Sequence, residues 1–455
     1  MRIAPLLALV LFSAAAHGAP DAEVDRTVAA RIDGDRSGVC VVAVRIVGRP
    51  DGGFSEQRAD RCASTARALP AVPGYRFEIG SISKAFTGVL LSEMVERKEL
   101  SLDDTVQQHL PAGVTMPRFE GLEVTLRDLV THTSGLPALP PGMRPASPLN
   151  PYANVDEKLV VGALAQLTLT HPPGEQHAYS NWAFMLLSDL LGRRAGQPYD
   201  VLLTERVLAP LGMKDTVVSD NRRLVTGHTS FGRDTAAWDF PARFGGVGAI
   251  RSTPEDMARF ARAMLGDVPK DAPATLQRAL VASTQPQRVV NERLTMATAW
   301  FLNKRADAAA PWVFHNGMTG GFSSSLLIDR QQRRAALVLA DAFGGFDDIA
   351  FRLLAPSAPL REPARPVALD LGRAQAAAGR YRLRENFEIT LLLDGEAMYG
   401  QATGQGRFPL KQDSRGDYYT EVTELLLRVV RDGAGKGTEL ILLQGGGMFR
   451  GQRVE

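Results

Sequence analysis

The chain has 455 residues, of which 45% are hydrophobic and 22% are charged, a composition typical of globular proteins and a length that allows two or three compact units. Its 52 basic and 50 acidic residues give a formal net charge of +2, and no long basic run disturbs this balance. Phosphate binding needs clustered lysine and arginine, so we expect no nucleic-acid partner.

The N-terminal segment has the pattern of a cleavable secretory signal. Arg2 precedes an apolar run at residues 3–16 that ends in small residues, as signal peptides do. A membrane-spanning helix needs about 20 apolar residues, so this run is short for a span, although an uncleaved anchor is the alternative. We predict a signal peptide at residues 1–18, no stable membrane span after its cleavage, and a periplasmic or secreted protein.

The two cysteines lie on either side of an expected hairpin that follows a helical stretch at residues 22–32. Cys40 and Cys62 occupy strand-like segments at equal distances from Asp51, which lies in a Pro/Gly-rich turn. Opposing residues of an antiparallel pair bring their β-carbons close enough for a bridge. A Cys40–Cys62 disulfide is therefore a hypothesis, with two buried free thiols as the alternative.

The segment FEIGSISKAFTGVLLSEMV places Ser81 and Lys84 three residues apart at the start of an apolar helical pattern. Residues three apart share a helix face, so the hydroxyl and the amine can point into one site. A serine nucleophile needs a partner that removes its proton, and a buried lysine with a lowered pKa can do this. A capping serine followed by a solvated lysine gives the same spacing, so the pair alone is a weak signal.

A second polar motif, Tyr179-Ser180-Asn181, precedes another apolar helical run at residues 182–191. A phenol can carry a proton between a nucleophile and a leaving group, and an asparagine amide can hold a substrate carbonyl. A loop tyrosine packed beneath a helix is the structural alternative.

A third motif, His315-Asn316-Gly317, lies in a strand-like segment and is followed by Met318 and a glycine-rich turn. Glycine lets a substrate approach the backbone closely, and an edge strand here could donate N–H groups to a developing oxyanion. The central region that carries these motifs mixes helical periodicity with glycine and proline, which favours a sheet with helices inserted between its strands.

The other histidines do not suggest a metal site. His132 lies in a turn rich in threonine, serine and glycine, where we expect structural hydrogen bonds. The remaining four show no metal-ligand spacing: His109, His171, His177 and His228. We therefore expect neither a metal nor another cofactor.

The C-terminal part of the chain changes character. Residues 355–369 hold four prolines and are predicted to be a linker. Residues 370–455 are predicted to form a separate all-β, barrel-like domain with strands that alternate in polarity: 381–384, 387–393, 418–422, 425–430 and 439–443, with a turn at Asp394-Gly395. The Gly435-Lys436 step lacks the glycine that a phosphate-binding loop requires at position 430, so we interpret it as a hairpin turn.

The three motifs in this order resemble those of the serine β-lactamase and penicillin-binding-protein superfamily. The resemblance covers residues 22–354 and is closest to class C β-lactamases and the related D-alanyl-D-alanine carboxypeptidases, D-aminopeptidases and esterases. Two further stretches look like segments of that group: LRDLVTHTSGLP and GGVGAIRSTPEDMARFARAML. The resemblance implies an α/β (α+β) domain at residues 19–354, in which helices and an all-helical insertion flank an antiparallel sheet.

The resemblance also implies a role for each motif residue. Ser81 would be the nucleophile, and Lys84 and Tyr179 would share proton transfer. Asn181 would bind the substrate amide, and His315 would hold a substrate carboxylate or adjust the Tyr179–Lys84 proton network. The N–H groups of Ser81 and Met318 would form an oxyanion hole, and Gly317 and Met318, on the strand that follows His315, would help to bind the substrate.

One departure from the family pattern bears on the substrate. Class C β-lactamases have Lys-Thr-Gly where this chain has His315-Asn316-Gly317, and histidine is mostly neutral at pH 7. Efficient hydrolysis of β-lactams is therefore in question, and the combination looks more like the D-specific peptidase branch.

Three functions remain open at this point. The first is hydrolysis of amide bonds in D-amino-acid peptides or β-lactams through an acyl-enzyme. The second is a carboxylesterase that also uses Ser81, because the G-x-S-x-G nucleophile motif is absent. The third is a penicillin-binding sensor that acylates without turnover. The expected partner is a small molecule or short peptide, and the oligomeric state is left open.

Overall fold

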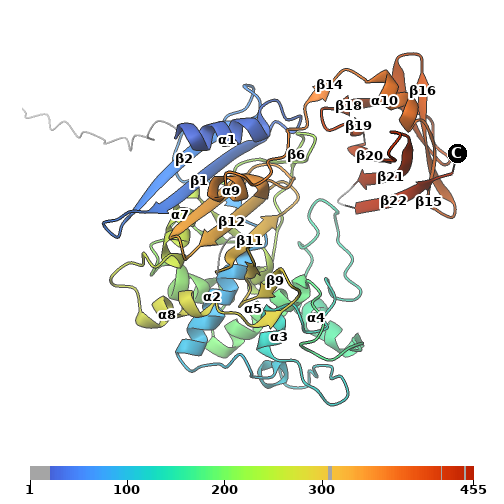
Figure 1. The fold of residues 1–455 in the computed structure, drawn as a ribbon. Helices are drawn as coiled ribbons and strands as arrows, with labels where there is room; N and C mark the ends of the chain where they lie inside the picture. The colour runs from blue at the N-terminus through green and yellow to red at the C-terminus, as the bar shows by residue number, and fades with distance from the viewer. Residues whose placement is uncertain (1–20, 306–309, 422, 445–446, 455) are drawn as a thin grey trace, which may run out of the picture.

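The computed structural model describes residues 21–305, 310–421, 423–444 and 447–454, so the expected signal peptide at residues 1–18 lies outside the described residues. Figure 1 shows a larger body of helices and sheet, and a barrel formed by the C-terminal strands. Within the described ranges, no helix has both the length and the apolar character needed to cross a membrane.

The larger body is built on an eight-stranded antiparallel sheet with the order β2-β1-β13-β12-β11-β10-β9-β8. Its strands are β1 (Cys40–Gly48), β2 (Phe54–Cys62), β8 (Arg288–Val289), β9 (Leu294–Met296), β10 (Phe301–Asn303), β11 (Trp312–Met318), β12 (Ser323–Asp329) and β13 (Arg334–Ala340). The N-terminal hairpin β1–β2 thus pairs with a strand from the far end of the domain. This antiparallel sheet with flanking helices confirms the predicted fold class.

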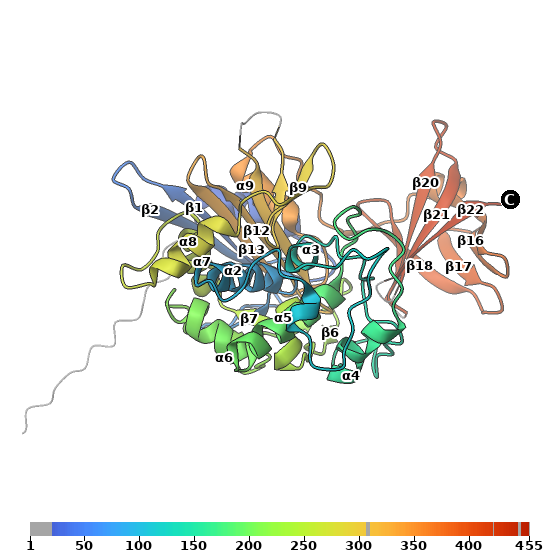
Figure 2. The same ribbon diagram turned by 90° about the horizontal axis from the view of Figure 1, so that it is seen from below.

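Alternate residues of each central strand enter two different cores, as the two-residue period of a strand dictates. Val42 and Val44 belong to a large core shared with most of the helices, whereas Val41 and Ala43 belong to a smaller one. The smaller core is covered by α1 (Ala22–Ile32) and α9 (Asp347–Leu354). Figure 2 shows α9 on one side of the sheet and α2 and α5 on the other.

The larger core is centred on α2 (Ile82–Glu96), whose residues are buried without a break from Ile82 to Met94. A helix that is enclosed on all sides cannot be strongly amphipathic, and this explains its largely apolar sequence. The other helices of this unit are α3 (Leu126–Val130), α4 (Glu157–Val160), α5 (Asn181–Ala195), α6 (Tyr199–Leu203), α7 (Pro254–Met264) and α8 (Ala274–Ala282).

Two small sheets complete the larger body. The first has the order β3-β7-β4, with β3 (Phe77–Glu78), β4 (Val217–Val218) and β7 (Ile250–Ser252). The second is a hairpin of β5 (Gly227–His228) and β6 (Asp234–Thr235). β3 leads directly into α2, and the β5–β6 hairpin lies on the side of the body that faces the barrel (Figure 1).

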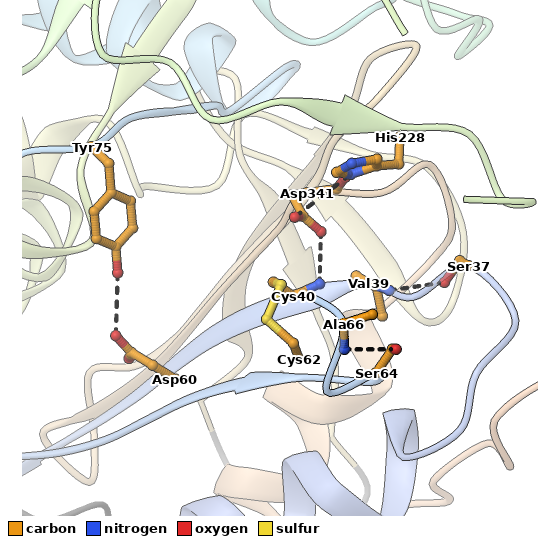
Figure 3. The surroundings of a disulfide bond; sticks show 10 residues. All are labelled: Ser37, Val39, Cys40, Asp60, Cys62, Ser64, Ala66, Tyr75, His228 and Asp341. Carbon is orange, nitrogen blue, oxygen red and sulfur yellow. Dashed lines mark hydrogen bonds and ion pairs between the residues drawn. A yellow bond between two sulfur atoms is a disulfide. The ribbon is translucent and has the colours of Figure 1, made fainter. Parts of the chain in front are cut away.

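Cys40 and Cys62 are directly opposite each other in the β1–β2 register and form a disulfide. Figure 3 shows the bridge beside the buried side chain of Asp341, whose Oδ1 accepts a hydrogen bond of 2.7 Å from the backbone N–H of Cys40. The bond is the one that the hairpin pairing predicts, and it ties the end of the edge strand β2 to the start of β1.

The C-terminal strands form a closed antiparallel barrel of eight strands, β15 to β22, because β18 also pairs with β19. The strands are β15 (Gly379–Arg384), β16 (Phe387–Asp394), β17 (Ala397–Ala402), β18 (Phe408–Asp413), β19 (Tyr418–Thr420), β20 (Leu425–Arg431), β21 (Gly437–Gln444) and β22 (Gly447–Arg453). Helix α10 (Leu371–Ala377) contributes Ala374 and Ala377 to the barrel core. The barrel confirms the predicted all-β character of this region.

The C-terminal region contains strands beyond those that the sequence predicted. The strands β17, β18 and β22 were not predicted, and β14 (Pro366–Val367) pairs with β18 inside the segment expected to be an irregular linker. The turn between β16 and β17 and the hairpin turn at Gly435-Lys436 occur as predicted, the latter with Lys436 O accepting from Asp432 N at 3.0 Å.

Candidate active site

Ser81 is held at the junction between β3 and α2. Gly80 makes the turn with φ of +50°, and a Cβ at this position would lie 2.7 Å from the backbone nitrogen of Met318. Both the left-handed backbone and the close approach therefore require glycine. The result is that the half-buried Ser81 lies directly beside the end of β11.

Lys84 lies one helical turn beyond Ser81 and faces it. Its Nζ is in hydrogen bonds with Ser81 Oγ at 2.9 Å and with Val247 O at 2.7 Å. It also lies 5.0 Å from the ring centroid of Tyr179 and 5.6 Å from that of Phe184. Burial lowers the pKa of Lys84 well below its ordinary value, because a charged amine loses its hydration here. The amine is thus suited to accept the proton of Ser81.

Tyr179 approaches Ser81 from the other side. Burial raises the pKa of its phenol above the ordinary value, while a hydrogen bond with the Ser81 side chain acts in the opposite direction. The phenol is therefore protonated at neutral pH. The structure brings together the three side chains that the motifs single out, since Ser81 contacts both Lys84 and Tyr179.

His132 fixes the segment that carries Tyr179. Its backbone oxygen accepts from Ala178 N at 2.8 Å, and its Nδ1 accepts from Ser180 N at 3.1 Å. The imidazole and phenol ring centroids are 4.2 Å apart, and burial keeps the pKa of His132 well below its ordinary value. The expected structural hydrogen bonds are confirmed, but their connection to Tyr179 could not be found in the sequence.

Asn181 is the first residue of α5, and its side-chain amide contacts the side chain of Tyr152. Its Nδ2 donates to Tyr152 Oη at 3.0 Å, and its buried Oδ1 has no hydrogen-bond partner within the described part of the chain. The Tyr152 ring packs against Trp238 and Phe240, with centroids 5.4 and 4.5 Å away. These three aromatic residues were not identified from the sequence, because only tertiary contacts connect them to Asn181.

His315 lies on β11 and is only 1% exposed. Its Nδ1 donates to Asn316 O at 2.7 Å, whereas its Nε2 is buried without a partner among the residues that the structure covers. Burial, and then the nearby Lys84, lower the pKa of His315 to about 3. A neutral ring cannot attract a carboxylate by charge, which weighs against carboxylate binding, one of the two roles that the resemblance implies for this residue.

Asn316 does not belong to the site. Because successive side chains of a strand point to opposite faces, Asn316 lies on the other side of the sheet from His315. Its Nδ2 donates to Asp347 Oδ2 at 3.0 Å, near the start of α9. This residue therefore connects β11 to the helix that covers the sheet.

The backbone at Gly317 and Met318 faces Ser81. A Cβ on Gly317 would lie 2.0 Å from Ile79 O and 2.8 Å from Ser81 N, so only glycine fits. Thr319 N donates to Phe322 O at 3.1 Å. Hydrogen-bonded pairs alternate along an antiparallel ladder, and the preceding N–H, that of Met318, consequently points away from β12.

On that side the neighbouring strand has already ended, since β10 pairs with β11 only as far as Phe314. The N–H of Met318 therefore has no β10 partner, and its nitrogen lies beside the turn at Gly80. The N–H groups of Ser81 and Met318, the two donors expected from the family resemblance, thus lie on either side of Gly80. Such a pair has the arrangement needed to stabilise a developing oxyanion.

Comparison with known proteins finds a family match and several relatives. The family model described as Beta-lactamase matches residues 24–357. The D-alanyl-D-alanine-carboxypeptidase/endopeptidase AmpH of Escherichia coli K12 is 33% identical over 186 residues, 40% of this chain and 47% of that protein. Protein flp of Staphylococcus aureus MW2 is 25% identical over 288 residues, 60% of this chain and 54% of that protein. The chain thus spans about half the length of these curated relatives.

Solved structures show the same fold at lower identity. A beta-lactamase/D-alanine carboxypeptidase from Yersinia pestis, complexed with citrate, superposes with a TM-score of 0.58 at 24% identity and covers 73% of this chain and 98% of its own. A class C beta-lactamase superposes with a TM-score of 0.60 at 20% identity and covers 74% of this chain and 98% of its own. The C-terminal barrel lies beyond the family match, which ends at residue 357.

Proposed function

Because this chain belongs to the beta-lactamase family, we propose that it is a serine hydrolase that cleaves amide bonds in D-amino-acid peptides or β-lactams through an acyl-enzyme on Ser81. The observation that carries the proposal is the contact of one serine hydroxyl with both a buried amine of lowered pKa and a protonated phenol. These two groups supply the base and the acid that acyl transfer requires.

In acylation, the neutral amine of Lys84 takes the proton from Ser81 while Oγ bonds to the substrate carbonyl carbon. The carbonyl electrons move to its oxygen, which the N–H groups of Ser81 and Met318 stabilise by about 3 kcal/mol each. When the carbonyl re-forms, the bond to the leaving nitrogen breaks and the phenol of Tyr179 protonates that nitrogen. The proton held by Lys84 then returns to Tyr179.

In deacylation, water attacks the ester carbon of the acyl-enzyme, and the neutral amine of Lys84 accepts its proton through the phenol of Tyr179. The oxyanion then collapses, the bond to Ser81 Oγ breaks, and the serine recovers its proton from the same pair. A penicillin-binding sensor would stop before this stage. The rate of deacylation therefore separates the enzyme from the sensor.

The surroundings of Ser81 favour a substrate without a free carboxylate at the scissile bond. His315 is neutral because its pKa is lowered to about 3, so it cannot replace the permanent charge of a lysine. The buried Oδ1 of Asn181 is an acceptor for a substrate N–H. These features support D-aminopeptidase-like or endopeptidase-like cleavage over efficient hydrolysis of β-lactams.

A carboxylesterase is the second candidate. The aromatic residues Tyr152, Trp238 and Phe240 pack together next to Asn181, and such a surface suits an uncharged, apolar acyl group. Esters are also easier acyl donors than amides. The same Ser81, Lys84 and Tyr179 would act on either substrate.

We also propose that the protein is exported to the periplasm or the medium. The signal-like N-terminus and the Cys40–Cys62 disulfide support this location, because disulfides persist in oxidising compartments.

The test is covalent labelling followed by intact-mass measurement. We expect the wild-type chain to gain one acyl mass from an activated ester or a penicillin, and the Ser81→Ala variant to gain none. Equal gains in both proteins would refute the assignment of the nucleophile. Steady-state rates on a D-Ala-D-Ala peptide, a peptide with an N-terminal D-alanine, a chromogenic cephalosporin and a short-chain p-nitrophenyl ester then rank the substrate classes.

A further inference from the structure

One carboxylate of the barrel, that of Glu424, contacts the tip of the β5–β6 hairpin. Thr229 Oγ1 donates to Glu424 Oε1 at 2.7 Å, and Arg233 Nε lies 3.5 Å from the same oxygen. Glu424 lies between β19 and β20 of the barrel, while Thr229 and Arg233 stand on the two sides of the hairpin tip. A single barrel residue thus holds both sides of a hairpin that belongs to the larger body.

Arg36 also contacts both the hairpin tip and the barrel. The guanidinium of Arg36 lies 5.1 Å from the ring centroid of Phe231, at the hairpin tip, and 4.8 Å from that of Tyr419, in the barrel. Arg36 also forms an ion pair with Asp413 of β18, and its side chain is only 9% exposed. Cation–π contacts gain strength when they are desolvated, so the buried Arg36 strengthens the contact between the hairpin tip and the barrel.

The base of the hairpin contacts the turn that joins β11 to β12. His228 N donates to Gly321 O at 3.1 Å. A Cβ on Gly321 would lie 2.8 Å from Gly227 Cα and 2.4 Å from Thr235 Cγ2. A Cβ on Gly320 would lie 2.7 Å from Trp238 Nε1. The turn therefore packs closely against the backbone of Gly227 and the side chains of Thr235 and Trp238, and its two glycines leave no side chain of its own that could absorb a displacement.

This turn directly follows Met318, whose backbone nitrogen lies beside Gly80, the residue that precedes the serine. We infer that the barrel positions the Met318 N–H, acting from Glu424 through the β5–β6 hairpin and the Gly320-Gly321 turn. The inference rests on the proposed function, in which that N–H stabilises the oxyanion. It makes Glu424 a positioning residue that is remote from the reacting atoms.

The expected effect is on the rate of acylation and not on binding. An oxyanion donor acts on charge that exists only in the transition state, so a displaced donor slows the chemical step and leaves substrate affinity nearly unchanged. Close-packed interiors transmit small displacements, and remote residues change such coupling by factors of roughly 3 to 30.

The experiment compares three variants of the full chain. Glu424→Ala removes the carboxylate, Glu424→Gln keeps an oxygen that can accept from Thr229, and Glu421→Ala is the matched control. Glu421 is exposed and pairs with Lys411 at 3.0 Å, entirely within the barrel. Stopped-flow release of p-nitrophenol from p-nitrophenyl acetate gives the acylation rate constant and the half-saturating concentration.

We expect Glu424→Ala to acylate roughly 3 to 30 times more slowly at an unchanged half-saturating concentration, Glu424→Gln to recover part of the rate, and Glu421→Ala to match the wild type. Amide hydrogen exchange at residues 318–322 should be faster in Glu424→Ala and unchanged in Glu421→Ala. Wild-type acylation in Glu424→Ala, or an equal loss in Glu421→Ala, would overturn the inference while the proposed function stands. Persisting acylation in Ser81→Ala would instead overturn the proposed function.

Discussion

The imidazole of His132 packs against the phenol of Tyr179 at a centroid distance of 4.2 Å, with the rings tilted by 31°, and its Nδ1 accepts from the N–H of the very next residue, Ser180. The ring contact and the hydrogen bond together fix both the backbone and the side chain of the proposed acid. His132 itself adopts φ of +58°, a left-handed conformation that asparagine tolerates better than most residues.

His132 therefore offers a test of how strictly Tyr179 must be positioned. We expect His132→Ala to lower kcat by about tenfold or more, because small misplacements of catalytic groups are costly. His132→Asn should lose less, since its side-chain oxygen can accept from Ser180 N and its backbone fits the left-handed region. Steady-state kinetics on an activated ester measure both, and a loss in His132→Asn as large as in His132→Ala would contradict this role.

Lys84 should be required for fast acylation, and its buried amine should lower the stability of the folded chain. Lys84→Met removes the base, so we expect acylation to slow by about 100-fold or more, while thermal unfolding shifts to higher temperature because an amine no longer has to be buried. Stopped-flow acylation and a thermal melt test both parts. A variant that is less stable than the wild type would contradict the second.

The lowered pKa of Lys84 also predicts the direction of the pH dependence. An unfolded lysine holds its proton up to about pH 10, whereas the folded one releases it at lower pH. The unfolded state thus binds more protons, and the free energy of unfolding of the wild type rises with pH over this interval. The acylation rate should rise with pH as well, and Lys84→Met should lack both dependences.

Asn181 provides a test of the substrate class. Its unpartnered Oδ1 is expected to accept an N–H from the acyl part of a peptide, and an acetyl ester has no such group. Asn181→Ala should lower kcat/KM for a D-peptide by about tenfold, the equivalent of one hydrogen bond, and change it little for p-nitrophenyl acetate. Equal losses on both substrates would mean that the residue supports the fold around Ser81 and not substrate binding.

The raised pKa of Asp341 predicts that the protein loses stability as the pH rises towards neutrality. Burial raises the pKa of its carboxyl group to about 7, whereas the unfolded value is about 3.9. Between these values the folded state holds the extra proton, so the free energy of unfolding falls as pH rises through this window. In Asp341→Asn the amide oxygen can still accept from Cys40 N (Figure 3), and the fall should disappear. Denaturant unfolding at pH 5 and pH 8 measures this, and parallel pH dependences in the two proteins would exclude the carboxyl group as its source.

The sequence predicted contacts between residues close in the chain better than contacts between distant segments. Ser81 and Lys84 meet because a helix brings residues three apart together, and Cys40 meets Cys62 because a hairpin fixes its register. The approach of Tyr179 to Ser81 was expected only from the family resemblance, since no periodicity connects the two segments. His132 and Tyr152 reach the site through the tertiary packing of loops, and their residue types gave no signal.

The barrel strands that were missed have a common cause. β17 contains Gly400, and β18 carries Pro409, Lys411 and Asp413, residue types that are depleted in strands. Closure of the barrel supplies the pairing that these segments need, and closure is a property of all eight strands together. β14 likewise forms only because β18 offers an open position beside it.

The pairing of β1 with β13 also determines when the large sheet can assemble. Val41 lies opposite Ala340, so the apolar strand that leaves the ribosome early has no central partner until nearly the whole domain has been synthesised. Contacts between such distant residues form slowly, and an unpaired β-strand edge is prone to aggregation. Protection of this early strand, by a chaperone or by its own hairpin, is thus a requirement that the topology places on the nascent chain.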